Sequence, residues 1–324
     1  MGFFKTLFTG KSDSPQETKQ KNDDRNFDIL KYDGIRALKI GKTSYAIRCF
    51  REALNIKSDI ETISHLATAL IQTNETEEAC QVLNKGIETD PSQIKLLLQL
   101  AQVNELQQNF NLMDENCTKA LALDRQNATV LYWAGKAKHA IHDDFQSIAF
   151  LTQAIQQDQN LQQAYQLRAE ILRNMNSFKE AEEDADYLLN HFEPTEESLL
   201  LKADLCTKRN DLPEAISYYN KVKTLYPLLG EAYVKLSQVY SENHQLDQSL
   251  DTINEAIDLL PDYAEAYKER GRIKLLLNDK NGAMDDIKKS LECNPEEAAN
   301  LNGSYTNIEQ QMNDQYKNQN PYGF

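Results

Sequence analysis

Residues that interrupt helices are scarce in this chain of 324 residues, which contains only 8 prolines and 11 glycines. Gln, Glu, Ala, Leu and Lys, which favour helices, are plentiful. The sequence contains no run of about 18 apolar residues, the length that a membrane-spanning helix needs. Its first residues also lack the apolar region and the small-residue cleavage site of a secretory signal peptide. We therefore expect a helical protein that resides in the cytoplasm.

No disulfide framework is expected from the five cysteines, Cys49, Cys80, Cys117, Cys206 and Cys293. Their number is odd, no two form a C-x-x-C pair, and four occupy apolar positions of predicted helices. Small buried thiols in a reducing compartment are the simpler interpretation.

Motifs of catalysis are also missing. The sequence contains no G-x-S-x-G, H-E-x-x-H, Walker or Rossmann glycine pattern. The nearest approach to a metal-ligand cluster is formed by His139, His142, Asp143 and Asp144 at a predicted turn. Such residues at an exposed turn are usually solvated, and no second set of ligands accompanies them. We expect a protein that is not an enzyme and holds neither a cofactor nor a metal.

Basic residues are fewer than acidic residues, and the chain carries a net charge of −15. The first 26 residues contain five Lys and Arg against four Asp and Glu, a net charge of +1, which leaves −16 for the remainder. An acidic surface repels a nucleic-acid backbone. The expected partner is therefore a protein or peptide with a basic or neutral recognition segment, and not a nucleic acid.

One stretch, residues 230–295, contains the same pattern twice with a spacing of 34 residues. Its first copy holds Tyr233, Leu236, Ser237, Tyr240, Ser249, Ile253, Ala256 and Pro261, and its second holds Tyr267, Arg270, Gly271, Lys274, Ala283, Ile287, Ser290 and Pro295. Extending the spacing toward the N-terminus gives copies that start at residues 60, 94, 128, 162 and 196. A first copy, one residue shorter, starts at Phe27, so the chain contains eight copies with no insertions.

Certain positions recur in all the copies when each is numbered from its first residue. Position 8 is small: Gly34, Ala67, Ala101, Gly135, Ala169, Ala203, Ser237 and Gly271. Position 4 is large and apolar: Leu30, Ile63, Leu97, Leu131, Tyr165, Leu199, Tyr233 and Tyr267. Position 20 is small everywhere except at Met113. Each copy predicts two helices joined by a tight turn, in which small residues at positions 8 and 20 let the backbones approach. Large side chains at positions 4 and 24 fill the space beside them.

The spacing and the order of these residues resemble the tetratricopeptide repeat, whose period is 34 residues and whose signature is an aromatic, Leu-Gly, Tyr, Ala, Phe and Pro. The resemblance implies an all-α fold, an α-solenoid wound as a right-handed superhelix, because one helical hairpin cannot bury its apolar face alone. The expected organisation is an apolar N-terminal segment and flexible linker (1–26), eight repeats, and a capping helix with a loose tail (298–324). The repeats span 27–59, 60–93, 94–127, 128–161, 162–195, 196–229, 230–263 and 264–297.

The resemblance also implies a function, that of a non-catalytic scaffold or adaptor that binds a partner peptide or protein. In the family, the first helices line a concave groove, with positions 2, 5, 9, 12 and 13 facing it and position 6 beside them. In the fourth and fifth repeats these positions hold Tyr132, Trp133, Lys136, His139, Gln166, Glu170 and Arg173. An aromatic pair beside a cation suits a peptide anchor. The alternative, that Tyr132 and Trp133 only pack against neighbouring helices, remains open.

Two other functions are less favoured. A membrane-surface adaptor would be tethered by residues 1–11, in which Phe3, Phe4, Leu7 and Phe8 share one helix side and Gly2 and Thr6 match a loose myristoylation pattern. We favour docking of this segment on the first repeat, or disorder, because four apolar residues anchor weakly. A co-chaperone would need a set of Lys, Arg and Asn residues that clamps a terminal carboxylate. The first repeat offers Lys31 but has Ile35 where the clamp has Asn.

Overall fold

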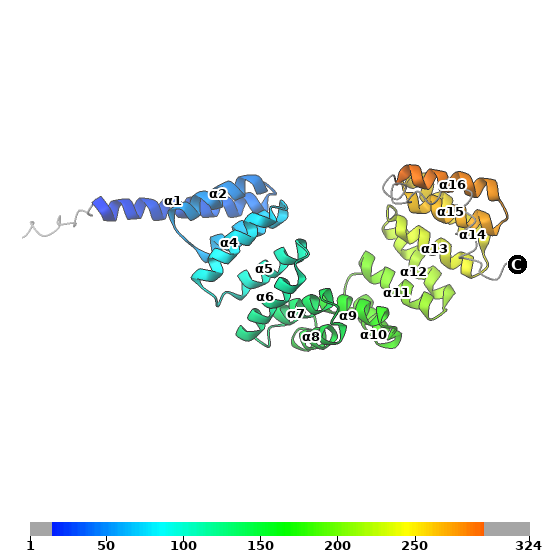
Figure 1. The fold of residues 1–324 in the computed structure, drawn as a ribbon, viewed down its shortest axis with the longest axis horizontal. Coiled ribbons are helices and arrows are strands. Elements are labelled where there is room, and N and C mark those ends of the chain that lie inside the picture. The colour runs from blue at the N-terminus through cyan, green and yellow to red at the C-terminus, as the bar shows by residue number, and fades with distance from the viewer. Residues whose placement is uncertain (1–14, 295–324) are drawn as a thin grey trace, which may run out of the picture. The chain divides into compact units, whose positions relative to one another are not determined.

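A computed structural model describes residues 15–294, and all regular structure in this range is α-helical, with no strand (Figure 1). The helices are α1 (Pro15–Lys39), α2 (Thr43–Ile56), α3 (Ile60–Gln72), α4 (Thr76–Thr89), α5 (Ile94–Leu106), α6 (Phe110–Leu123), α7 (Ala128–Ala140), α8 (Asp144–Gln157), α9 (Gln162–Asn174), α10 (Phe178–His191), α11 (Glu196–Lys208), α12 (Leu212–Leu225), α13 (Gly230–Glu242), α14 (Leu246–Leu259), α15 (Ala264–Leu276) and α16 (Lys280–Cys293).

The helices follow one another as helix–turn–helix pairs, which confirms the predicted all-α fold of about eight repeats. From the second pair onward, the first helices begin at residues 60, 94, 128, 162, 196, 230 and 264. These are the residues at which the 34-residue spacing starts each copy. The chain divides into two compact units, an N-terminal unit (Met1–Ala164) and a C-terminal unit (Tyr165–Phe324).

The small residues at position 8 allow close contact between the two helices of a pair. A Cβ atom added to Gly34 would lie 2.5 Å from the ring of Phe50, which occupies position 24. At Gly135 the added atom would lie 2.8 Å from Cγ of Leu151, again at position 24. Since both distances are shorter than a van der Waals contact, the side chain at position 24 fills the space that glycine leaves. Met113, the exception at position 20, is fully buried and packs in a cluster with Ala101.

A feature that the repeat pattern did not indicate occurs at position 15, directly after each first helix. The backbone is left-handed there in every repeat, with φ between 58° and 72° at Gly41, Asn74, Gln108, His142, Asn176, Asn210, His244 and Asn278. In the second repeat, the amide of Glu75 donates to the carbonyl of Leu70 at 2.8 Å. The amide of Asn74 donates to the carbonyl of Ile71 at 3.1 Å. This is the Schellman arrangement, which ends a helix by satisfying its last carbonyls.

The left-handed backbone leads to a prediction for Gln108, whose φ is 58°. We expect Gln108→Gly to raise the free energy of unfolding by about 1 kcal/mol, because a side chain with a Cβ is strained in this region and glycine is not. The reciprocal variant is Gly41→Ala, where φ is 72° and no atom lies within 4 Å of the added methyl. It should lower stability by a similar amount. Urea denaturation followed by fluorescence of the single tryptophan measures both, and a loss of stability in Gln108→Gly would contradict the assignment of strain.

The N-terminal part of α1 differs from the sequence prediction. Residues 15–26 were expected to belong to a flexible linker, but they continue the helix of the first repeat without a break. This segment contains several good helix formers and no glycine, and its single proline stands in the first turn, where it is tolerated. Asp24 also lies 3.9 Å from Lys57, which follows α2. The apolar segment 1–11 and the predicted capping helix and tail at 298–324 lie outside the described residues.

Candidate protein-interaction surface

Three of the predicted site residues gather on α7 in the N-terminal unit. The rings of Tyr132 and Trp133 meet edge to face, with centroids 6.1 Å apart and an interplanar angle of 73°. The Nζ atom of Lys136 lies 5.0 Å from the centroid of the Trp133 ring, within the range of a cation–π contact. All three side chains are half-buried. The structure therefore brings together the aromatic pair and the cation.

The inner side of Trp133 is part of the protein interior. Its ring packs against the buried cluster of Ala101, Met113, Cys117, Ala134 and Ala137, which joins the third and fourth repeats. Trp133 thus packs against neighbouring helices, as the alternative interpretation predicts, and its side chain still keeps exposed surface. An aromatic ring held in this way offers contact area to a partner at little further cost in side-chain entropy.

Lys136 has an intramolecular partner that the sequence did not reveal. Its Nζ donates to the carboxylate of Glu105 on α5 at 2.8 Å. The cation of the aromatic cluster is therefore neutralised within the N-terminal unit. His139, the fourth predicted residue on α7, also has an intramolecular partner, since its Nδ1 is 2.6 Å from Asp144 on α8.

No group of three or more His, Cys, Asp and Glu side chains within residues 15–294 is placed to hold a metal ion. His142 belongs to the left-handed turn, and the Asp143 carboxylate caps α8 by accepting from the amide of Gln146 at 3.2 Å. These side chains have local structural contacts.

The other predicted residues lie on α9 and belong to the C-terminal unit. Gln166 Nε2 donates to Glu170 at 2.6 Å, and Arg173 Nη1 donates to Asp204 on α11 at 2.8 Å. The predicted residues thus fall into two separate sets, one in each unit.

Asp204 collects several donors from three helices. Besides Arg173 it accepts from Lys235 on α13 at 2.9 Å and from the hydroxyl of Tyr219 on α12 at 2.5 Å. Burial raises the pKa of the Tyr219 hydroxyl, and the negative charge of Asp204 raises it further. Burial alone would lower the pKa of Lys235, but the attraction of Asp204 outweighs it, so this pKa is raised. Asp204 therefore ties the fifth, sixth and seventh repeats together along their first helices.

A spacing of 31 residues marks these contacts between successive first helices. It separates Glu105 from Lys136, Arg173 from Asp204, and Asp204 from Lys235. Opposite charges 31 residues apart in the sequence thus indicate pairs between successive first helices, which the groove positions alone do not reveal. The partners missed in this way are Glu105 and Asp204.

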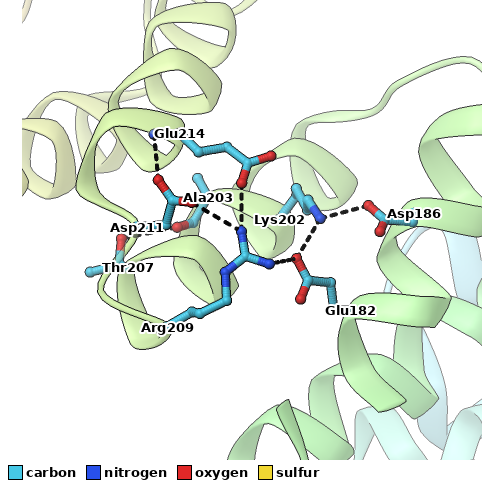
Figure 2. A network of polar contacts seen from close by, with 8 residues as sticks. All are labelled: Glu182, Asp186, Lys202, Ala203, Thr207, Arg209, Asp211 and Glu214. Carbon is cyan, nitrogen blue, oxygen red and sulfur yellow. Dashed lines mark hydrogen bonds and ion pairs between the residues drawn. The ribbon is translucent and has the colours of Figure 1, made fainter. Parts of the chain in front are cut away.

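A second charged network joins the fifth and sixth repeats (Figure 2). Lys202 on α11 is 4% exposed, and its Nζ lies 2.7 Å from Glu182 and 2.6 Å from Asp186, both on α10. Arg209 follows α11 and contacts Glu182 and Glu214 at 2.6 Å each. The network therefore connects α10, α11 and α12 through a buried ammonium group.

Models of the tetratricopeptide repeat match residues 60–93 and 167–228. The first range is one complete copy of the 34-residue spacing. No curated protein sequence matches the chain. No helix within residues 15–294 is long and apolar enough to cross a membrane.

Solved structures share the fold at low sequence identity. A tetratricopeptide repeat protein from Parabacteroides merdae is 19% identical with a TM-score of 0.59, over 72% of this chain and 93% of that one. The protein pilF of Pseudomonas aeruginosa is 20% identical with a TM-score of 0.56, over 64% and 94%. One chain of the APC/C hetero-tetramer Cut9–Hcn1 is 13% identical with a TM-score of 0.58, over 87% and 57%. The helix pairs, their spacing and these matches together establish that the chain is a tetratricopeptide repeat protein.

Proposed function

We propose that this protein is a non-catalytic interaction scaffold that binds a partner peptide or protein on the face formed by its first helices. The observation that carries the proposal is the placement of Trp133. Its ring is backed by a buried cluster, flanked by Tyr132 and Lys136, and still half-exposed. Fixed aromatic side chains of this kind are common hot spots of protein interfaces.

The charges around the aromatic pair favour a particular class of partner. Lys136 is paired with Glu105, so this cation adds no net positive charge to the surface. The chain as a whole carries −15. A segment with an apolar side chain for the aromatic pair and neutral or basic neighbours would meet attraction, whereas an acidic segment would meet repulsion.

On α9, a partner would compete with internal contacts. Arg173 is engaged by Asp204, and Glu170 by Gln166. A basic group of the partner can reach Glu170 by displacing the neutral amide of Gln166. Displacing Asp204 from Arg173 costs more, because Asp204 also holds Lys235 and Tyr219. We therefore place the main contact at Tyr132 and Trp133, with Gln166 and Glu170 secondary.

The surroundings of Lys31 give no support to a carboxylate clamp. Its Nζ is 3.0 Å from Asp59 and 2.6 Å from Glu61, and the side chain of Ile35 has no donor. A terminal carboxylate would have to displace two carboxylates that already hold this lysine. The adaptor that we propose is therefore not one for acidic chaperone tails.

Replacing Trp133 by Ala tests the proposal directly. We expect the affinity for a captured partner to fall by at least about 2 kcal/mol, roughly thirtyfold, because the central aromatic contact is lost. The partner is first identified by mass spectrometry after capture on the purified chain, and its affinity is then measured by calorimetry. The fraction of folded protein is checked by circular dichroism.

Phe150 supplies a matched control, since it packs against the same buried cluster from α8, a second helix. Phe150→Ala should lower thermal stability about as much as Trp133→Ala and leave the affinity unchanged. If both variants weaken binding equally, Trp133 acts only through packing. If neither does, the partner binds elsewhere.

A further inference from the structure

Phe145, at the start of α8, has the most exposed large apolar side chain among the described residues, with 79% of its surface accessible. It occupies position 18 of the fourth repeat. The other seven repeats hold Ser44, Glu77, Asn111, Lys179, Pro213, Asp247 and Asn281 at this position. The repeat fold therefore does not require an aromatic residue there, and an exposed phenyl ring has a cost in water.

A hollow of about 540 Å³ lies on the same edge of the N-terminal unit, where the turns of the third and fourth repeats meet. It is lined by Gln108, Asn109, Phe110, Asn111, Leu112, Ala140, Ile141 and His142. No Asp, Glu, Lys or Arg is among them. Leu112 is 47% exposed, although position 19 is Glu in the second, fifth and sixth repeats. The hollow opens to solvent, so a side chain of another molecule can contact Leu112 and the other lining residues.

We propose that two copies of this chain pair through this edge, with Phe145 of each copy inserted into the hollow of the other. A two-fold contact requires that one patch carry both complementary parts. Phe145 follows the hollow-lining His142 by three residues, so the projecting ring and the hollow share one edge.

Charge favours a second copy at this place over the rest of the surface. Two chains that each carry a net charge of −15 repel each other, and this repulsion is weakest where the facing surfaces carry no charge. The two acids that precede Phe145 in the sequence are already engaged, because Asp144 contacts His139 at 2.6 Å and Asp143 caps α8. The amides of Gln108, Asn109 and Asn111 can still bond to water or to the partner copy at the rim.

Sedimentation equilibrium of the full chain tests the proposal with residues borrowed from equivalent positions. Phe145→Asn introduces the residue of the third and eighth repeats, and Leu112→Glu introduces that of three others, so both should fold. We expect a concentration-dependent dimer for the wild type and a dissociation constant at least about tenfold higher for each variant. Leu228→Asn, at a leucine that is 71% exposed in the C-terminal unit, should dimerise like the wild type.

Mixing the variants tests the insertion itself. Phe145→Asn retains an intact hollow and Leu112→Glu retains the phenyl ring, so a mixed pair restores one of the two contacts. An equimolar mixture should therefore associate more tightly than either variant alone. The proposal is overturned by a monomeric wild type, by Phe145→Asn dimerising like the wild type, or by a mixture that gains nothing. The same holds if the wild type binds only an unrelated apolar peptide at this edge.

Discussion

Lys202→Met is expected to lower the free energy of unfolding of the C-terminal unit by about 2 kcal/mol, because a buried ammonium group that contacts two carboxylates is removed. The loss is smaller than for a fully buried ion pair, because Asp186 is half-exposed and Arg209 still contacts Glu182. Methionine keeps most of the apolar stem, so the loss comes from the charge. Without the ammonium group, Glu182 and Asp186 lose a cation within 2.7 Å. Arg209 still reaches Glu182, whereas the contact between Lys202 and Asp186 is lost (Figure 2).

Hydrogen exchange over α10, α11 and α12 measures this effect locally, which matters because a solenoid need not unfold in one step. The control is Lys289→Met, whose ion pair with Glu292 is about half-exposed. It should change stability much less than Lys202→Met, because an exposed ion pair is screened by solvent. Neutralising the acids as well, with Glu182→Gln and Asp186→Asn, should recover part of the loss. A loss in Lys202→Met no larger than in the control would show that the buried network does not stabilise the unit.

The pKa shifts define the pH range of this effect. Burial alone would lower the pKa of Lys202, but the hydrogen bonds to Asp186 and Glu182 outweigh burial and raise it. The stabilisation is therefore complete below the unfolded-state pKa of about 10.4 and is lost as the pH rises through the folded-state value. Burial alone would raise the pKa of Glu182, and the bond from Lys202 lowers it. That contribution is lost as the pH falls below about 4.3, so the difference between variant and wild type should be constant from about pH 5 to 10.

Leu151→Ala is expected to destabilise the N-terminal unit by about 3 kcal/mol, within the range of 2–5 kcal/mol for a buried leucine. Leu151 is fully buried, and its side chain occupies the space beside Gly135. Gly135→Ala alone should cost about 1–2 kcal/mol, because the new methyl lies 2.8 Å from Leu151 Cγ. In the double variant the methyl enters space that Leu151 has vacated, so the combined loss should be at least about 1 kcal/mol smaller than the sum.

Fluorescence of Trp133 during urea denaturation follows this unit, since it contains the only tryptophan. Leu123→Ala, at a leucine that is 46% exposed on α6, is the control and should cost much less than Leu151→Ala. Strictly additive losses at Gly135 and Leu151 would contradict the role assigned to positions 8 and 24.

The sequence by itself determined the helix pairs and their packing. Neighbouring repeats contact one another in the same way each time, so side-chain size at position 8 recurs with the period of the fold. Gly34 and Gly135 showed where two helices meet, and the 34-residue spacing gave the starts of the first helices. The sequence also singled out Tyr132, Trp133 and Lys136, which the structure brings together on α7.

Only the tertiary structure decided which charged side chains are already paired and which apolar ones remain exposed. The partners of Lys136 and Arg173 lie 31 residues away and depend on how first helices stack. The extension of α1 to Pro15 and the left-handed backbone at Gln108 and His142 were likewise not evident, because these residue types do not demand the conformations they adopt. The sequence alone does not distinguish Phe145 from other apolar residues near turns, and its exposure is evident only from the structure. Local periodicity specifies the repeat. The identity of a binding surface depends on contacts between repeats, and there a single residue that differs from its equivalents in the other repeats changes the surface without changing the fold.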